Sequence, residues 1–380
     1  MPSTQLRLNV LAAARRVVVK VGTQTLNQPG VGRPKLEQGY MDHMADQVIA
    51  LRKEGRQVTL VCSGAIGAGC AALGFAKRPT DVSVLQAVAS VGQRLLMTHL
   101  HDAFARHGVE VGQVLLTRED IDDRARFINI RNCLNALHEL GCVPVINEND
   151  TVAVDEIRFG DNDTLAALVA NAIRADALVL LTVVDGMLDA QGCAIDLVES
   201  VDQVLALIRD EKSALGTGGI TTKLAAARIV TQAGEVAVIA NGRTPDVLTR
   251  LFKGERLGTV FQPARRKLTS RSRWIGLTSR PAGSVTLDDG AIKALRDRGK
   301  SLLARGITAC EGHFGRGQVL SVRDAQGGEV ARGLTNYPSE ELRLIMGRRS
   351  TEFQAILGRE AYDEVIHRDN LVLAGERAPR

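Results

Sequence analysis

The first two-thirds of the chain alternates short β-branched runs with amphipathic stretches. Runs with the length and composition of buried strands lie at residues 15–22, 57–64, 109–117, 142–150, 177–186 and 235–242. Between them, segments such as 36–55 and 163–174 carry apolar residues at helical spacing. This alternation predicts a mainly parallel sheet with helices on both faces, a three-layer αβα sandwich.

The pattern changes after residue 262. Residues 263–279 are polar and basic, which indicates a linker, and short alternating runs with frequent turn residues follow. Turn signals stand at Asp289-Gly290 and Gly327-Gly328, and a last apolar run closes the segment 367–373. We therefore expect one domain over residues 1–262 and a second domain, a small β-barrel, over residues 280–375.

Polar and glycine residues gather where the expected strands end. Each group follows an apolar run: Lys20-Val21-Gly22-Thr23, Ser63-Gly64-Ala65, Asn147 to Asp150, and Asn241-Gly242. Ligands of open parallel α/β sheets bind outside the carboxyl ends of the strands. The sequence therefore predicts a ligand site at this edge of the sheet.

Composition adds limits to this picture. The 380 residues are 45% hydrophobic and 24% charged, which is typical of a soluble globular protein with two or more domains. No apolar run reaches the ~18 residues that span a bilayer, and the first residues lack the pattern of a secretory signal, so we expect a cytoplasmic protein. The six cysteines form no C-x-x-C pair; reduced, buried thiols and no protein-built metal site are expected.

Charge is distributed unevenly along the chain. Residues 1–264 hold 27 Lys+Arg against 29 Asp+Glu, a net −2, whereas residues 265–380 hold 21 against 14, a net +7. This asymmetry supports a domain boundary and indicates a polyanion contact for the second domain. An ordinary basic surface would give the same counts.

Two segments offer positive charge or free N–H groups at the expected edge. Lys20 closes a buried run and places an amine there, although a lysine that merely reaches solvent from a strand end would look the same. The segment "SGAIGAG" (63–69) has three glycines in a strand-to-helix turn, where backbone N–H groups bind anions. Glycine-rich turns are common, so this signal is weak alone.

The segments "INENDTV" (146–152) and "FGDNDTLAA" (159–167) concentrate amides and carboxylates. The run from Asn147 to Asp150 exceeds what a turn needs and suits a small zwitterion, whose ammonium requires oxygen acceptors. Asp161, Asn162 and Asp163 stand just before a predicted helix, where Asp163 or Asn162 would equally serve as an N-cap.

The segment "GTGGITTKLAAA" (216–227) joins a glycine-rich loop to a helix but does not match a Walker loop, because Lys223 comes four residues after Gly219. Its amides and Lys223 would face a phosphate. With Lys20 this gives two cations, which phosphoryl transfer requires, and Mg²⁺ held mainly by ATP oxygens would complete the set. This interpretation requires Lys20 and Lys223 to converge although they are far apart in sequence.

Six segments, in order, resemble the glutamate 5-kinases of the amino-acid kinase family: "VVVKVGTQT", "VCSGAIGAG", "QVLLTRED", "VPVINENDTV", "FGDNDTLAA" and "GTGGITTK". The C-terminal part resembles the PUA domain that many bacterial members carry. The resemblance implies ATP- and Mg²⁺-dependent phosphorylation of the γ-carboxylate of L-glutamate to L-glutamyl 5-phosphate, the first step of L-proline biosynthesis. It also implies feedback inhibition by L-proline and a homo-oligomer, a dimer or tetramer.

The same resemblance implies roles for individual residues. Lys20 and Lys223 would stabilise the transferring phosphoryl group, and Asp161 would hold the two lysines in place. The glutamate-binding residues would be Ser63, Gly64, Asn147, Asp150 and Asn162. The ATP-binding residues would be Lys20, Thr182, Val183, Thr217, Gly218, Gly219, Ile220, Thr221, Thr222 and Lys223.

The chain departs from the family pattern on the nucleotide side. Val183 stands where an aspartate is usual, Leu188 where a tyrosine is usual, and Ile220 where methionine is common. Asp185 stands two places after Val183, so the segment keeps a carboxylate.

Two other functions fit parts of the sequence. The basic C-terminal part and its PUA-like pattern suit an RNA-binding or RNA-modifying protein, but that part has few aromatic residues for stacking on bases. A non-catalytic sensor on the same scaffold is disfavoured because both lysines and Asp161 are present.

Overall fold

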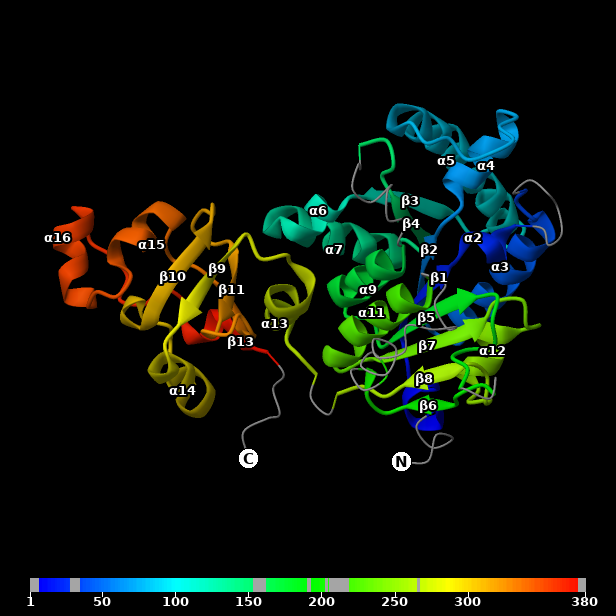
Figure 1. Cartoon of the computed structure of the whole chain (residues 1–380). Helices are drawn as coiled ribbons and strands as arrows, with labels where there is room; N and C mark the ends of the chain where they lie inside the picture. Colours follow the sequence, from blue (N-terminus) through cyan, green and yellow to red (C-terminus); the bar gives the residue numbers. More distant parts are fainter. Residues whose placement is uncertain are drawn as a thin grey trace. The chain divides into compact units, whose positions relative to one another are not determined.

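The β-branched runs of the first part of the chain form one eight-stranded sheet in the computed structural model (Figure 1). The structure describes residues 7–27, 35–152, 162–189, 193–201, 204, 219–264 and 267–374. The strand order is β3 (Val111–Leu116), β4 (Val143–Glu148), β2 (Gln57–Cys62), β1 (Arg16–Val21), β5 (Ala177–Thr182), β7 (Val236–Asn241), β8 (Thr259–Phe261) and β6 (Leu197–Val198).

The six strands expected from the sequence are confirmed, and they pair in parallel. The two others, β8 and β6, were not expected, because runs of three and two residues carry too little pattern to recognise. β8 runs antiparallel to β7, and β6 pairs in parallel with β8. The sheet is therefore mainly parallel with a short antiparallel margin.

Helices cover both faces of this sheet (Figure 1). One face packs against α3 (Gln38–Lys53), α5 (Val82–Ala105) and α12 (Val247–Phe252). The other face packs against α7 (Arg124–Glu139), α9 (Asn162–Ile173) and α11 (Gly219–Gln232). The shorter helices of this part are α2 (Thr23–Leu26), α4 (Ala65–Ala72) and α6 (Arg118–Asp122). The expected αβα architecture is confirmed.

The central strand β1 is buried on both faces, and its alternation decides where Lys20 lies. Val17, Val19 and Val21 belong to the core that contains α3 and α12. Because successive side chains of a strand point to opposite faces, Lys20 projects toward the face that α9 covers.

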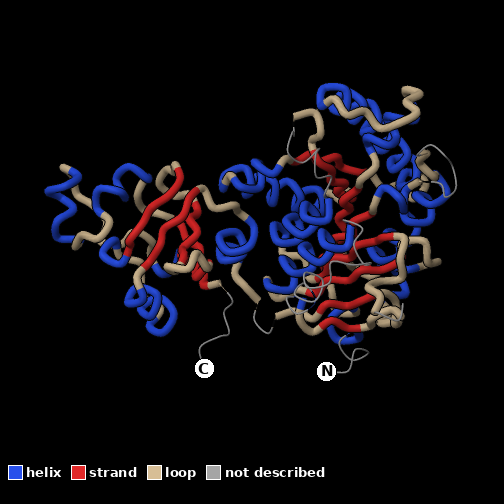
Figure 2. The backbone as a smooth tube through the Cα atoms, viewed as in Figure 1, coloured by secondary structure: helices blue, strands red, loops and turns tan. Residues whose placement is uncertain are grey.

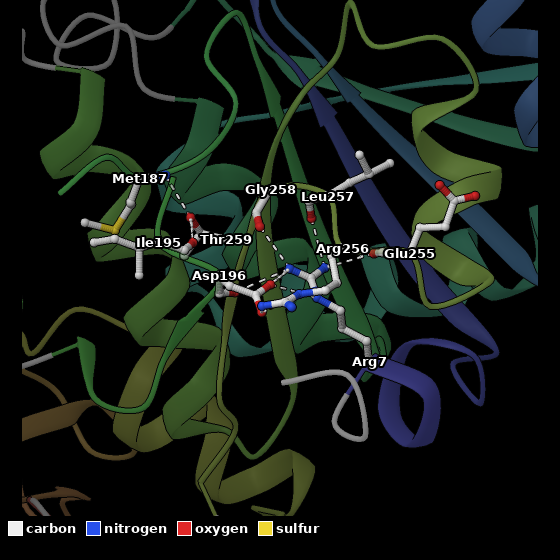
Figure 3. Close-up of polar contacts among 9 residues, drawn as sticks. All are labelled: Arg7, Met187, Ile195, Asp196, Glu255, Arg256, Leu257, Gly258 and Thr259. Atoms are coloured by element: carbon white, nitrogen blue, oxygen red, sulfur yellow. Dashed lines mark hydrogen bonds and ion pairs between the residues drawn. The ribbon is translucent and has the colours of Figure 1, made fainter. Parts of the chain in front are cut away.

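Arg7 fixes the start of the described chain to the margin of the sheet (Figure 3). Its fully buried side chain forms a 2.6 Å ion pair with Asp196. It also donates to the backbone carbonyls of Glu255, Leu257 and Gly258. A buried guanidinium is tolerated only when it is paired and hydrogen-bonded, and here it is.

The loop after β5 is held against β8 by Thr259 (Figure 3). The hydroxyl of Thr259 accepts from the Met187 backbone N–H at 2.8 Å and donates to the Ile195 carbonyl at 2.6 Å. Gly186, with φ +126°, allows the close approach, because a Cβ there would lie 2.6 Å from the Thr259 hydroxyl. The backbone of the loop on the expected nucleotide side is therefore fixed to β8 at Met187 and Ile195.

The described chain divides into two compact units, Met1–Lys267 and Leu268–Arg380. The second unit contains a five-stranded, mainly antiparallel sheet (Figure 2). Its order is β10 (Ile307–Gly312), β9 (Gly283–Leu287), β11 (Val319–Arg323), β12 (Glu329–Leu334) and β13 (Leu371–Leu373), with β9 and β11 parallel. The helices of this unit are α13 (Ser270–Arg273), α14 (Asp289–Arg298), α15 (Ser339–Ile345) and α16 (Phe353–Leu357).

Of the two turns predicted in the second unit, one is present and the other is not. Gly327-Gly328 lies in the turn between β11 and β12, as expected. The expected turn at Asp289-Gly290 is wrong, because α14 begins there and the Asp288 side chain caps it by accepting from the Ala291 N–H. Part of the segment expected to be a linker is also helical, since α13 lies within it.

Two further expectations can be compared with the described residues. All six cysteines are free, but only Cys62 and Cys70 are buried, whereas Cys133 and Cys193 are exposed, so the expectation of generally buried thiols is wrong. None of the helices within the described ranges has the length and apolar character that crossing a membrane demands.

Candidate active site

Lys20 and Lys223 meet at one carboxylate, that of Asp163. Lys20 Nζ lies 2.6 Å from Asp163 Oδ1, and Lys223 Nζ lies 3.0 Å from Asp163 Oδ2. The side chains of Lys20 and Asp163 are 8% and 3% exposed, so this is a buried ionic contact. The convergence of the two lysines that the sequence required is therefore present. We call Lys20, Asp163 and Lys223 the charged cluster.

Three different elements supply the charged cluster. Lys20 comes from β1, Asp163 from the first turn of α9, and Lys223 from the first turns of α11. The Thr222 hydroxyl also donates to Asp163 Oδ2 at 3.0 Å, so this oxygen accepts from both Thr222 and Lys223. The backbone carbonyl of Gly219 accepts from Lys223 Nζ at 3.1 Å, which fixes the direction of that lysine.

The environment keeps Asp163 ionised. Burial alone would raise the pKa of its carboxyl, but Lys20 and Lys223 more than offset this and hold the pKa below its usual value. Two lysines and one aspartate leave a net positive charge in a site of low exposure. Such a cluster suits an anionic group that can approach both amines.

The residue that joins the lysines was not identified from the sequence. Asp161, to which the resemblance gave this role, lies outside the described residues. Asp163 was considered only as a helix cap, and the structure instead places its carboxylate between the two amines. In a D-N-D triplet, the start of α9 decides which carboxylate faces β1, and that start is not fixed by spacing alone.

A cavity of about 270 Å³ is lined by residues from the ends of β1, β2 and β4 and from the start of α9. All five residues expected to bind glutamate line it: Ser63, Gly64, Asn147, Asp150 and Asn162. Gly64 adopts φ +105°, a conformation that favours glycine, and so turns the chain from β2 into α4. The strand ends thus meet at one cavity, to which they contribute polar side chains.

Side-chain amides form a connected network on this surface. Asn162 Nδ2 lies 2.9 Å from the Cys62 carbonyl, 3.0 Å from Ser63 Oγ and 2.9 Å from Asn147 Oδ1. Asn147 Nδ2 in turn donates to Gln93 Oε1 at 2.8 Å. We call Ser63, Gln93, Asn147 and Asn162 the amide network. Its buried members hold the strand ends together without net charge.

Asp150 adds a carboxylate whose proton affinity is unusual. Burial raises the pKa of Asp150 to about 6, and the positive charge of Arg78 partly opposes this. A cation bound beside Asp150 would favour its ionised form. The residue can therefore act as an acceptor for a ligand ammonium near neutral pH.

Several lining residues were missed by the sequence analysis. Thr23 and Glu148 adjoin expected residues, and Lys77 and Arg78 come from the segment after α4. Thr23 and Glu148 were quoted among the polar strand ends, which was the available signal. Nothing in the spacing of Lys77 and Arg78 linked them to the other strands.

The expected nucleotide side is described only in part. Gly219 to Lys223 begin α11, whereas Thr217 and Gly218 lie outside the described residues. Thr182 ends β5 and is partly buried, and Val183 follows it with 41% exposure. The structure therefore places the described residues of this group at the same edge of the sheet as Lys20.

Within the described ranges, no group of three or more His, Cys, Asp or Glu side chains is arranged to hold a metal ion. Each oxygen of the Asp163 carboxylate is in an ion pair with one of the two lysines. The two lysine amines are donors of a kind that binds an anion.

Comparison with known proteins places this geometry in a family. Residues 15–241 match the amino acid kinase family and residues 283–357 match the PUA domain. The glutamate 5-kinase of Chromohalobacter salexigens is 47% identical over 371 residues, covering 96% of this chain and 97% of that protein. The glutamate 5-kinase of Teredinibacter turnerae is 44% identical over 371 residues, covering 96% and 99%.

Among solved structures, carbamate kinase from Giardia lamblia bound to AMP-PNP aligns with 67% of this chain and 100% of its own, with TM-score 0.47 and 19% identity. The sequence relatives, by contrast, extend over both units of the chain. The chain belongs to the amino acid kinase family, in its glutamate 5-kinase branch.

Proposed function

We propose that the protein transfers the γ-phosphoryl group of ATP to the γ-carboxylate of L-glutamate, giving L-glutamyl 5-phosphate and ADP. The observation that carries this proposal is the meeting of Lys20 and Lys223 at Asp163, beside a cavity lined by amides and a carboxylate. The name shared by the relatives supports the choice of substrate.

The chemistry needs little from the protein besides positioning and charge. A γ-carboxylate oxygen of glutamate attacks the γ-phosphorus as the bond to the β,γ-bridging oxygen breaks, and ADP takes the electron pair. Because a glutamate side chain has a pKa of about 4.3, the nucleophile is already ionised at neutral pH and requires no general base.

The charged cluster would stabilise the transferring group. Asp163 holds the two amines before substrate arrives, so little reorganisation is needed as negative charge develops. Lys20 would serve both the transferring group and the nucleotide. Mg²⁺, carried by ATP oxygens, would neutralise further phosphate charge.

The cavity would bind glutamate through its zwitterionic end. Asp150 and the amide oxygen of Asn162 suit an ammonium, while Ser63 and the N–H groups near Gly64 suit a carboxylate. The start of α11, from Gly219 to Lys223, would face the ATP phosphates, since the N-terminus of a helix offers free N–H groups.

We also propose that L-proline inhibits the enzyme and that the reaction opens proline biosynthesis. Proline shares a cationic nitrogen and an adjacent carboxylate with glutamate, so a cavity that accepts one zwitterion is suited to the other. A homo-oligomer, expected from the same family resemblance, belongs to this proposal.

One assay tests the proposed reaction directly. The protein is incubated with ATP, Mg²⁺ and L-glutamate, and the acyl phosphate is trapped with hydroxylamine as the hydroxamate. Production that depends on both ATP and glutamate supports the proposal, and its decrease by L-proline supports the inhibition. Absence of hydroxamate from folded protein would overturn the assignment.

Lys223→Ala is expected to lower kcat by at least about a hundredfold, because one preorganised charge contributes about 3 kcal/mol to transition-state stabilisation. The exposed Lys53→Ala at the end of α3 is the matched control and should keep the wild-type kcat. A Lys223→Ala enzyme with wild-type turnover would contradict the role of this amine.

Nucleic-acid binding by the second unit receives less support. Of its aromatic side chains, Trp274, Phe314, Tyr337 and Phe353 are buried, and Tyr362 is 43% exposed. Stacking on single-stranded bases requires exposed rings. Electrophoretic mobility shift at low and physiological salt tests this alternative, since purely electrostatic binding weakens steeply as salt rises.

A further inference from the structure

Two backbone groups fix the direction of the amide network. The carbonyl of Cys62 can only accept, so Asn162 must turn its Nδ2 toward that carbonyl, at 2.9 Å. The backbone N–H of Glu148 can only donate, so Asn147 must turn its Oδ1 toward that group, also at 2.9 Å. The orientation of both amides is therefore set by their surroundings.

This orientation determines what Gln93 must offer. Since Asn147 Oδ1 serves Glu148 and Asn162, its Nδ2 faces away from them, toward Gln93. Gln93 accepts there through Oε1 at 2.8 Å, and its Nε2 is buried without a hydrogen-bond partner among the described residues. In the orientation that lets Gln93 accept from Asn147, its own Nε2 is therefore left without an acceptor among these residues.

Asn162 also has a side-chain atom without a hydrogen-bond partner within the described ranges, and in this residue the atom is an acceptor. With Nδ2 engaged by three acceptors, its Oδ1 is buried and has no partner among the residues that the structure describes. Asn162 lines the cavity. Leaving a buried acceptor unpaired is unfavourable, so this oxygen is suited to a donor that arrives with the ligand.

The backbone of Gln93 is held close to the cavity by its neighbour. At Gly92 a Cβ would lie 1.7 Å from the Ala65 carbonyl, so α5 and α4, adjacent in Figure 1, are in direct backbone contact at this point. Ala65 itself lines the cavity. The glycine thus places the next residue, Gln93, within reach of Asn147.

We propose that Gln93 is a positioning residue for recognition of the substrate ammonium. By accepting from Asn147 it keeps the amide network in one orientation, and Asn162 Oδ1 is then presented as the acceptor for that ammonium. This inference rests on the proposed function, because it takes the ligand to be an amino acid. On this inference, the amide network makes the enzyme prefer substrates that carry an amine.

The test compares three variants of the full-length protein. Gln93→Leu removes the acceptor, and Gln93→Glu keeps an acceptor at the same place. Gln86→Leu is the matched control on the same helix, at a residue that is not among those lining the cavity. Hydroxamate formation gives kcat and KM for glutamate, and titration calorimetry gives binding of glutamate and of glutarate, which lacks the amine.

Gln93→Leu is expected to raise the KM for glutamate about tenfold with kcat within about threefold, because a buried donor on Asn147 is left unpaired and the network loosens. Glutarate binding should change far less, so the preference for glutamate over glutarate falls. Gln93→Glu and Gln86→Leu should keep the KM within about threefold of wild type. If Gln93→Leu does not fold, Gln93→Met replaces it in the same comparison.

Three results would overturn the inference: an unchanged KM in Gln93→Leu, an equal loss of glutamate and glutarate binding, or a Gln93→Glu variant as impaired as Gln93→Leu. These outcomes differ from failure of the proposed function, in which the wild-type protein itself forms no hydroxamate from glutamate.

Discussion

Lys20 and Lys223 hold their places by balancing charge on Asp163, whereas Asn147 and Asn162 hold each other through neutral amides. The two arrangements meet at consecutive residues of α9, because Asn162 belongs to the amide network and Asp163 to the charged cluster. In the charged cluster each carboxylate oxygen is already in an ion pair with a lysine amine. In the amide network one acceptor has none among the described residues.

This difference suggests a division of labour. A cluster that is complete without ligand is preorganised, and preorganised charge acts mainly on the transition state. An unpaired acceptor instead gains its partner when substrate binds, so it acts on the ground state as well. Variants of the charged cluster should therefore change kcat, and variants around the amide network should change KM.

The largest expected effect is that of Asp163→Asn. The two lysines lose their shared counter-charge, repel each other and no longer converge, so kcat should fall by about a thousandfold, corresponding to about 4 kcal/mol. The KM for glutamate should stay within about threefold. Steady-state kinetics measures both, and the exposed Asp102→Asn on α5 is the matched control. A larger change in KM than in kcat would contradict the assignment of the charged cluster to the transition state.

A smaller effect is expected from pH. The pKa of Asp150 is raised to about 6, so this carboxyl takes up a proton as pH falls through 6 and can no longer attract an ammonium as an anion. The kcat/KM for glutamate should fall by up to about tenfold for each pH unit below 6. Initial rates at low glutamate between pH 8 and pH 5 test this.

The Asp150→Asn variant serves as the control for that profile. It should have a lower kcat/KM at pH 7.5 and should lose the step near pH 6. A wild-type profile that stays level down to pH 5 would show that the ionisation of Asp150 does not govern binding.

The smallest expected effect concerns stability. Because the folded-state pKa of Asp150 is raised, its contribution to stability is full below its unfolded pKa and is lost as pH rises through about 6. At pH 7.5 the unliganded Asp150→Asn protein should therefore be more stable by about 1–2 kcal/mol, seen as a rise of a few degrees in Tm. Saturating glutamate should reduce this difference in Tm, because bound glutamate stabilises the wild type. A lower Tm for unliganded Asp150→Asn would contradict the unfavourable burial of this carboxylate.

The strands and the cavity could be predicted well from the sequence. Runs such as 57–64 and 235–242 contain enough apolar residues to mark β2 and β7, and the polar groups after them meet because parallel strands end at one edge. Short elements such as β6 carry no comparable pattern. At Asp289-Gly290 the sequence predicted a turn, but the same residue types also begin a capped helix.

Side-chain partners were harder to predict than positions. The phosphoryl-transfer interpretation required Lys20 and Lys223 to meet, but the role of Asp163 depended on where α9 starts. Gln93 lies in an ordinary amphipathic helix, and only the contact of Gly92 with α4 brings it to Asn147. Such contacts depend on packing between helices, which a single sequence does not encode as spacing.

The buried guanidinium near the start of the chain has a consequence for synthesis on the ribosome. The hydrogen-bond partners of Arg7 are made much later than Arg7 itself: Asp196 follows it by 189 residues and the Gly258 carbonyl by 251 residues. In an emerging chain Arg7 is therefore hydrated by water until nearly the whole first unit has left the exit tunnel. Completion of this unit is therefore a late, long-range event of folding during synthesis, because Arg7 reaches its buried position only after the residues around Gly258 have been made.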